Sequence, residues 1–229
     1  MKKILLFTSA ALLIAFVLFT DMVRRDVFLT QSPMGGVDFD LTVKLQNNVP
    51  ARLDPLLELM TTSASAPVIG LILLVVLGVL YRSFGALVIF VAWGGGQLLE
   101  LVLKNMLRQP GPPFQFQRIH TAVNFDKDYQ LVGYSYPSGH SFRVVFLVIV
   151  ATFLVARRYG WSSKSAALTA VATSGFATVV MVAKVVHGGH WTTDIVGGAL
   201  LGGAAACASL VFVSLPKAKK NAPVTNDGA

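Results

Sequence analysis

Long apolar runs separated by short polar stretches make up most of the chain. A helix needs about 20 mostly apolar residues to cross a bilayer, and six segments approach or reach that length. They cover residues 4–20, 66–80, 84–103, 138–156, 165–186 and 191–215. The pattern therefore predicts an all-α membrane protein built as a bundle of six transmembrane helices.

The stretch between the first two predicted spans, residues 37–65, follows another pattern. Apolar residues recur there at mixed helical spacing, with acids and amides between them. A helix with one apolar and one polar face lies in the membrane interface rather than across the membrane. We expect one or two interfacial amphipathic helices between the first and second transmembrane helices.

The two ends of the chain differ in character. The first span follows Lys2 and Lys3, yet no small-x-small cleavage site precedes Asp21, so a retained anchor is favoured over a removed signal peptide. Residues 217–229 are polar and are expected to form a disordered cytoplasmic tail. Because no repeat or soluble domain is visible, residues 1–216 are predicted to form a single membrane domain.

Composition supports the membrane assignment. The chain is 54% apolar and 13% charged, outside the usual soluble range of about half apolar and a quarter charged. Its net charge of +8 comes from short cationic clusters between the apolar runs. Such clusters suit anionic lipid headgroups or phosphates better than nucleic acid. The single cysteine, Cys207, excludes an internal disulfide framework and argues against a thiol-rich metal site.

Charge in the loops also predicts an orientation. Short segments rich in Lys and Arg and free of acids fall on the side of both termini, which favours cytoplasmic termini in a multi-pass protein of the cell membrane. Three polar clusters then share the opposite, extracytoplasmic side. They are Lys104 at the end of the third span, the PSGH segment at residues 137–140, and the HGGHWTTD segment at residues 187–194.

The PSGH segment has the character of an anion site. Ser138 is a good N-cap, and Gly139 lets a bound group approach the backbone. A helix N-terminus offers free N–H groups and the positive end of its dipole to an anion. His140 follows in the first turn, beside any anion held there. The plainer alternative is a capped helix start with an interfacial histidine.

The HGGHWTTD segment carries a histidine and a carboxylate at helical spacing. His190 and Asp194 are four residues apart, so on a helix they share a face and the carboxylate can orient the imidazole. An oriented neutral imidazole can act as a base or a nucleophile. His187 precedes His190 by three residues, so these two histidines with Asp194 could instead ligate a divalent metal ion. Interfacial histidines before a polar helix cap are the plainer alternative.

Further charges lie close to these clusters. Glu100 is one turn before Lys104, and an ion pair between them is the simplest expectation. Arg108 is one turn after Lys104, so the two cations would stack if the third span continued by another turn. Arg143 lies inside the fourth span, where an unpaired cation is costly. We therefore expect its side chain to point inward, toward Asp194 or a ligand.

Together the clusters resemble the type 2 phosphatidic acid phosphatase (PAP2) superfamily. Its members are six-span helical bundles with three motifs, K-x6-R-P, P-S-G-H and S-R-x5-H-x3-D. Residues 137–140 match the second motif in full, and residues 183–194, AKVVHGGHWTTD, keep the histidine and aspartate of the third in register. In span number and motif order the resemblance covers residues 4–215.

The resemblance implies a mechanism. His190 would attack phosphorus and form a phosphohistidine, oriented by Asp194. His140 would protonate the leaving oxygen and later activate water. Fixed positive charge would offset the charge on the phosphoryl oxygens, so no metal or cofactor is expected. The groups that would hold those oxygens are Ser138, Gly139 and Lys104.

The chain departs from the motifs at three positions. Gly111 stands where the first motif has Arg, Ala183 replaces the Ser of the third motif, and Lys184 replaces its Arg. Lysine keeps the charge but loses bidentate phosphate binding. Further cations would then be needed at the phosphate, and Arg108 and Arg143 are the candidates.

The expected function is hydrolysis of a membrane lipid phosphate or diphosphate. Isoprenoid diphosphates, phosphatidic acid and phosphatidylglycerol phosphate all share the part that the motifs hold. Two alternatives stay open. The missing arginine suggests a non-catalytic lipid-phosphate binder or transporter on the same scaffold. The histidine spacing suggests a metal-dependent hydrolase using His187, His190 and Asp194.

Overall fold

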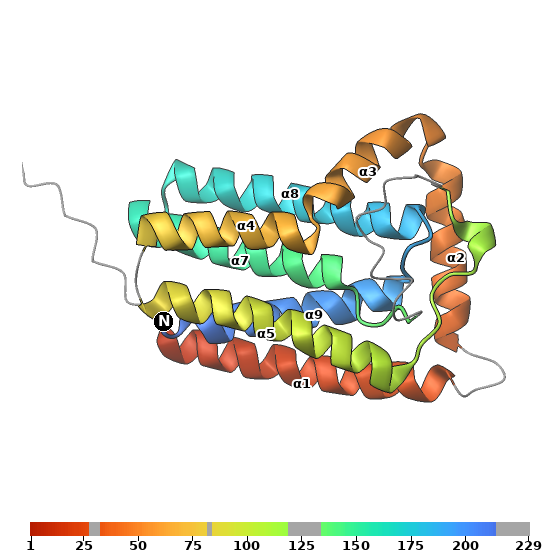
Figure 1. The fold of residues 1–229 in the computed structure, drawn as a ribbon, viewed down its shortest axis with the longest axis horizontal. Helices are drawn as coiled ribbons and strands as arrows, with labels where there is room; N and C mark the ends of the chain where they lie inside the picture. The colour runs from red at the N-terminus through yellow and green to blue at the C-terminus, as the bar shows by residue number, and fades with distance from the viewer. Residues whose placement is uncertain (28–32, 82–83, 119–133, 214–229) are drawn as a thin grey trace, which may run out of the picture.

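The computed structural model describes residues 1–27, 33–81, 84–118 and 134–213, and these residues are predominantly helical (Figure 1). Within them, five unbroken helices are long and apolar enough to cross a membrane. Five of the six predicted spans are thereby recovered, with small shifts at their ends. The helices are α1 (Lys2–Val27), α5 (Phe84–Leu107), α7 (Gly139–Tyr159), α8 (Lys164–Val186) and α9 (Thr192–Leu210).

The remaining predicted span, residues 66–80, is helical but short. It forms α4 (Ala66–Val75), which continues as the π-helix η2 (Val76–Tyr81). The short helix η1 (Ala51–Leu53) and α3 (Asp54–Ser63) precede it, and residues 51–63 and 66–78 form a pair bent by 51°. Taken as one span, this bent pair is a sixth candidate by length and composition. Pro67 near the start of α4 suits a helix beginning there, because the first turn needs no proline N–H.

The segment predicted to be amphipathic also forms helices. Its first part is α2 (Pro33–Asn48), which lies across one end of the bundle (Figure 1). Asp38 and Thr42 of α2 are buried, whereas Val37 and Phe39 are exposed. Two polar side chains of α2 thus face the bundle, while its exposed side mixes apolar residues with charged ones such as Asp40.

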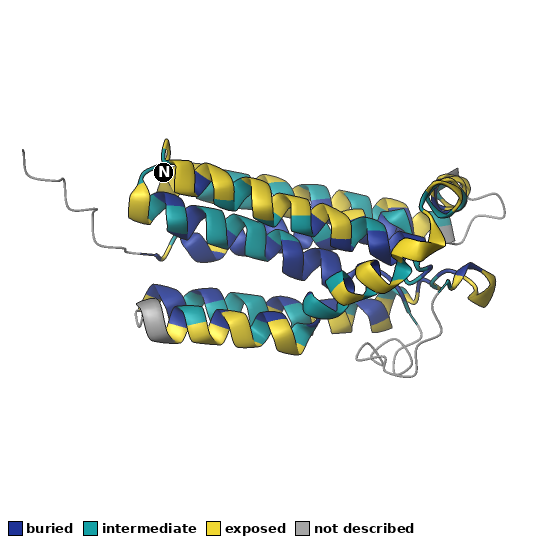
Figure 2. Ribbon diagram, turned by 90° about the horizontal axis from the view of Figure 1, so that it is seen from above, coloured by how far each residue is buried: buried dark blue, intermediate teal, exposed yellow. Residues whose placement is uncertain are grey.

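Helix α9 lies at the centre of the packing between the spanning helices. It is the most buried of the spanning helices, while α1 is the least buried. A Cβ on Gly198 would overlap the carbonyl oxygen of Ser138, and one on Gly202 would overlap that of Phe142. This Gly-x-x-x-Gly spacing lets the backbones of α9 and α7 approach closely, as in many membrane helix pairs. Exposed residues lie on the outward sides of the helices (Figure 2). Many of them are apolar, such as Phe7 and Val171.

The chain path brings the polar clusters to one end. The C-terminal ends of α5 and α8 and the N-terminal ends of α7 and α9 meet at the end of the bundle crossed by α2 (Figure 1). The start of α1 and the end of α9 lie at the opposite end. The predicted convergence of the three polar clusters is confirmed. The predicted tail, residues 217–229, lies outside the described residues.

Candidate active site

His190 and Asp194 form a fully buried pair at the turn between α8 and α9. The Nδ1 atom of His190 lies 3.2 Å from Oδ2 of Asp194, and neither residue is exposed to solvent. Gly188 in the turn has a φ of 67°, which glycine adopts without strain. The Asp194 carboxylate also accepts the Trp191 backbone N–H at 2.8 Å. This second bond fixes the carboxylate, so the contact expected from the spacing is present and rigidly held.

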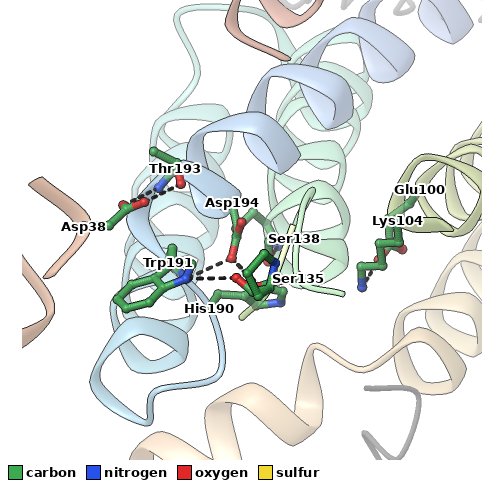
Figure 3. A network of polar contacts seen from close by, with 11 residues as sticks. Asp38, Glu100, Lys104, Ser135, Ser138, His190, Trp191, Thr193 and Asp194 are labelled. Carbon is green, nitrogen blue, oxygen red and sulfur yellow. Dashed lines mark hydrogen bonds and ion pairs between the residues drawn. The ribbon is translucent and has the colours of Figure 1, made fainter. Parts of the chain in front are cut away.

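Ser135 is a third member of this group, and sequence reasoning missed it. Its hydroxyl lies 3.0 Å from Nδ1 of His190 and donates a short hydrogen bond to Asp194 (Figure 3). Since the hydroxyl proton goes to the carboxylate, the Ser135 oxygen accepts from Nδ1–H of His190. The neutral imidazole then keeps its lone pair on Nε2. The one available signal was that Ser135 directly precedes the Tyr-Pro that leads into the PSGH segment.

The start of α7 is tied to the same group. Ser138 is the N-cap, and its hydroxyl accepts the Ser141 backbone N–H at 3.4 Å, as predicted. Its own backbone N–H donates to the carbonyl oxygen of Asp194 at 3.0 Å. The N-terminus of α7 is thus bonded directly to the His190–Asp194 pair, although Ser138 and Asp194 are far apart in sequence.

Arg143 points inward, as expected, but its partners differ from the one expected. It donates to the carbonyl oxygen of Ala64 at 2.9 Å and to Oε1 of Gln97 at 2.8 Å. Its third contact is to Nδ1 of His140, at 3.1 Å. The predicted pairing with Asp194 is therefore wrong. Because a guanidinium only donates, Nδ1 of His140 accepts and the neutral ring carries its proton on Nε2.

Lys104 and Glu100 form the predicted ion pair. Nζ of Lys104 lies 2.6 Å from Oε1 of Glu100, and both side chains are almost completely buried. The Glu100 carboxylate packs against the start of α7, since a Cβ on Gly139 would lie 2.6 and 2.7 Å from its two oxygens. Glu100 thereby places the end of α5, with its lysine, beside the N-terminus of α7.

Lys184 lies beneath the turn that carries His190. It belongs to the last turn of α8 and is 7% exposed. Its carbonyl oxygen accepts the backbone N–H groups of Gly189 at 2.9 Å and of His190 at 3.2 Å. A Cβ on Gly189 would lie 3.9 Å from its Nζ. The cation that replaces the motif arginine is thus retained next to the histidine.

Arg108 does not stack on Lys104 in the way the spacing suggested. Helix α5 ends at Leu107, and Arg108 takes a left-handed φ of 52°. Its side chain is exposed and donates from Nε to the carbonyl oxygen of Asn105 at 3.3 Å. Helix α5 does continue for one turn beyond residue 103, but the left-handed backbone of Arg108 ends it before the two cations can stack. Just beyond this point Pro110 accepts a hydrogen bond from Trp191 Nε1 at 3.1 Å.

The position of the missing motif arginine is close to the pair. Gly111 follows Pro110, and a Cβ on Gly111 would lie 3.3 Å from Cβ and 3.5 Å from Oγ of Ser135. The backbone N–H of Ser135 also donates to the carbonyl oxygen of Gln109 at 2.9 Å. A side chain at position 111 would therefore start next to the serine that contacts His190.

His187 has different surroundings from His190. Burial lowers the pKa of His187 from 6.5 to about 4, and the charges that act on it most are those of Asp54 and Lys184. Within the described residues, no three His, Cys, Asp or Glu side chains are grouped so that they could hold a metal ion. The geometry thus lends no support to a metal site of His187, His190 and Asp194.

A second buried carboxylate that sequence reasoning missed comes from α2. Asp38 accepts the backbone N–H of Thr193 at 2.9 Å and its hydroxyl at 2.6 Å (Figure 3). Thr193 is the residue before Asp194, so α2 contacts the first turn of α9 directly. The sequence offered no signal for this contact, because Asp38 is one of several acids in an amphipathic segment.

Comparison with known proteins adds to this geometry. Phosphatidylglycerophosphatase B of Bacillus subtilis (strain 168) is 26% identical over 141 residues, which are 61% of this chain and 64% of that protein, slightly under two thirds of its length. The crystal structure of a transmembrane PAP2 type phosphatidylglycerolphosphate phosphatase from Bacillus subtilis has a similar fold. Its TM-score is 0.70 at 18% identity, covering 89% of this chain and 94% of that one. The family model of the PAP2 superfamily matches residues 85–217. The chain belongs to the PAP2 superfamily.

Proposed function

We propose that the protein is a membrane phosphatase that hydrolyses a lipid phosphate or diphosphate through a phosphohistidine on His190. The observation that carries the proposal is the arrangement around this residue. Its Nδ1 is held by Ser135 and Asp194 in a fully buried site. The same site is bonded to the N-terminus of α7, a place suited to a phosphoryl group.

The first step forms the phosphoenzyme. Nε2 of His190 attacks phosphorus with its lone pair, and the bond from phosphorus to the leaving oxygen breaks. That oxygen takes a proton from His140. Positive charge and N–H donors offset the charge on the phosphoryl oxygens. In this proposal the groups that hold those oxygens are Lys104, Ser138, Gly139 and Lys184, with Arg108 and Arg143 as further cations.

The second step releases phosphate. A water molecule gives a proton to His140 while its oxygen attacks phosphorus, and the bond between phosphorus and Nε2 of His190 breaks. The histidine regains its lone pair, and the Asp194 carboxylate stabilises the imidazolium of the intermediate in both steps. One water is consumed for each inorganic phosphate released. The charges in both steps are met by side chains, so the proposal calls for no cofactor.

Arg143 has a particular part in this scheme. In the structure it donates to Nδ1 of His140, a contact that is incompatible with a second proton on that ring. His140 must carry two protons before it can protonate the leaving oxygen. The guanidinium of Arg143 would therefore turn from His140 toward the bound phosphate. Substrate binding would then free Nδ1 of His140 to take up the second proton that the general acid needs.

The substrate is proposed to be a phosphorylated membrane lipid. Phosphatidylglycerol phosphate is the first lipid to try, because the similar proteins are named for it. Phosphatidic acid and an isoprenoid diphosphate complete the panel, since the site groups hold only the phosphate that all three share. Each would be presented to the purified protein in detergent micelles, with excess chelator, and phosphate release would be measured.

Two variants test the mechanism within that assay. His190→Ala should abolish turnover. His140→Ala should accumulate a phosphoenzyme with a substrate whose leaving group needs little protonation, because attack can proceed but release is slow. Near-normal turnover by His190→Ala would refute the phosphohistidine. Lipid binding without any turnover by the wild type would favour a non-catalytic binder, and loss of turnover in chelator would favour a metal-dependent hydrolase.

A further inference from the structure

Helix α2 makes a buried contact with the active-site turn through Asp38 and Thr193. Both carboxylate oxygens of Asp38 accept hydrogen bonds from Thr193, one from its backbone N–H and one from its hydroxyl. Asp38 is 3% exposed and Thr193 is 6% exposed. The two residues are 155 positions apart. Figure 3 shows this pair beside Trp191 and Asp194.

Helix α9 needs such a contact because of its own N-cap residue. The first N–H groups of a helix have no partner inside the helix, and an N-cap side chain with an oxygen acceptor normally takes one of them. The N-cap of α9 is Trp191, whose side chain offers only a donor. Asp38 supplies the missing acceptor to Thr193. Its negative charge also lies at the positive end of the helix dipole.

Keeping a carboxylate at this place has a cost. Burial raises the pKa of Asp38, and the nearby Asp194 charge acts in the same direction, while the hydrogen bonds from Thr193 oppose both. Asp38 and Asp194 repel each other when both are charged. A neutral residue at position 38 would therefore be favoured if α2 only had to pack against the bundle. Asp38 lies outside residues 85–217, the part that matches the family model, so it reaches the site from the N-terminal part of the chain.

In sequence, Thr193 lies between His190, in the turn before α9, and Asp194, in the first turn of α9. Thr193 directly precedes Asp194, and His190 is three residues before Thr193. The distance of 3.2 Å between His190 and Asp194 spans this first turn. Resting on the phosphatase function proposed above, we propose that Asp38 is a positioning residue for the reaction. It holds Thr193 and thereby sets the geometry in which Asp194 orients His190.

Kinetics of purified variants test the proposal. Asp38→Ala should lower kcat by about 10²-fold, because a small displacement of the reacting groups has an effect of this size. KM should stay within about twofold of the wild-type value, because Asp38 does not belong to the groups that bind phosphate. Thr193→Val should act in the same direction, whereas Thr193→Ser, which keeps the hydroxyl, should retain most of kcat. The double variant Asp38→Ala/Thr193→Val should be no worse than the poorer single variant.

Matched controls separate positioning from general damage. Asp40→Asn removes an exposed carboxylate of the same helix and should leave kcat unchanged. If Asp38→Ala does not fold, Asp38→Asn keeps one acceptor oxygen and should still show a lower kcat at unchanged KM. A lower melting temperature with unchanged kcat would overturn the proposal, because Asp38 would then only stabilise the fold. A rise in KM alone would also overturn it.

A spectroscopic readout keeps this test independent of the substrate. In protein labelled with ¹⁵N-histidine, the Nδ1–H proton of His190 should give a hydrogen-bonded signal, assigned by its absence in His190→Gln. Asp38→Ala should shift or broaden that signal, and Asp40→Asn should not. If the wild type releases no phosphate from any lipid, the phosphatase proposal fails while this measurement still tests Asp38. An unchanged signal in Asp38→Ala would refute the positioning role.

Discussion

The hydroxyl of Ser135 lies 3.0 Å from Nδ1 of His190 and donates to the Asp194 carboxylate, so it touches both members of the pair. All three side chains are buried, and water is therefore not at hand to replace a lost partner. A buried polar group left without a partner costs about 1–3 kcal/mol. The hydroxyl thus helps to keep the proton of the imidazole on Nδ1.

Removing this hydroxyl should weaken catalysis more than binding. We expect Ser135→Ala to lower kcat by about 10- to 100-fold, the equivalent of about 1–3 kcal/mol, with little change in KM. Phosphate release at several lipid concentrations gives both constants. Ser162→Ala, an exposed serine beyond α7, serves as control. A wild-type kcat in Ser135→Ala would mean that Asp194 alone orients His190.

Arg108 can be tested without disturbing the turn it occupies. Its φ of 52° suits glycine better than arginine. Arg108→Gly therefore removes the cation while keeping or improving stability. If Arg108 contacts the bound phosphate, KM should rise and kcat fall together, lowering kcat/KM by about tenfold. Unchanged kinetics with unchanged or higher melting temperature would exclude Arg108 from the phosphate site.

The same experiment can restore the arginine of the family motif. A side chain at position 111 starts 3.3 Å from Cβ of Ser135, so the loop has to shift by only a few tenths of an ångström. Gly111→Arg in the Arg108→Gly background should recover part of the lost kcat/KM. Gly111→Ala in that background adds the same strain without the charge and should recover nothing.

Arg143 is expected to matter first for stability. It contacts Ala64, Gln97 and His140 and is 6% exposed. Arg143→Ala leaves these buried groups without their donor, at about 1–3 kcal/mol for each group left unpaired. The melting temperature in detergent should fall clearly, and Arg143→Lys should recover only part of it, because an ammonium does not have the guanidinium's fork geometry. A stable but inactive Arg143→Ala would instead identify Arg143 as a principal phosphate ligand.

The orientation in the membrane can be read by labelling. The single native cysteine, Cys207, is buried, so Cys207→Ala gives a clean background. Gln115→Cys marks the active-site end and Ser162→Cys the opposite end, both at exposed positions. With cytoplasmic termini, an impermeant maleimide should label Gln115→Cys in intact cells and Ser162→Cys only after lysis. The reverse pattern would place the active site on the cytoplasmic side.

His187 should make the fold sensitive to acid. Burial lowers its pKa in the folded protein from 6.5 to about 4, so between these values the unfolded chain binds more protons. Stability contributed by the neutral histidine is present above pH 6.5 and is lost as the pH falls toward 4. Melting temperatures from pH 7.5 to 4.5 should decline less in His187→Gln than in the wild type. Equal declines would assign the acid sensitivity to other groups.

Much of the fold follows from sequence because the bilayer leaves few choices. A backbone in hydrocarbon must satisfy its own hydrogen bonds, so each long apolar run has to be a helix. The predicted starts at residues 66 and 84 agree with those of α4 and α5. The span over residues 66–80 is the exception. Its α-helix is too short to count as a span alone, and it becomes a sixth candidate only when it is taken together with α3 across their bend.

The sequence by itself also determined the contacts that are local. Glu100 and Lys104 are four residues apart within α5, so helical geometry brings them together in almost any fold. His190 and Asp194 are also four residues apart, but His190 precedes α9, and its contact comes from the turn and from Asp194 in the first turn of α9. The third span was predicted to end at residue 103, and α5 continues for one more turn to Leu107. Beyond this point the chain turns, and Pro110 accepts a hydrogen bond from Trp191. The periodicity of the sequence does not reveal such a long-range contact.

Only the tertiary structure decided which distant residues complete the site. Ser135 reaches His190 across 55 positions, and Asp38 reaches Thr193 across 155. In both contacts a buried polar side chain finds its hydrogen-bond partner. Which residue becomes that partner depends on which segments lie next to each other once the helices have packed. A serine in a loop and an acid in an amphipathic helix carry no periodic signal of their own. The close approach of α9 to α7, together with α2 lying across the end of the bundle, gives them their roles.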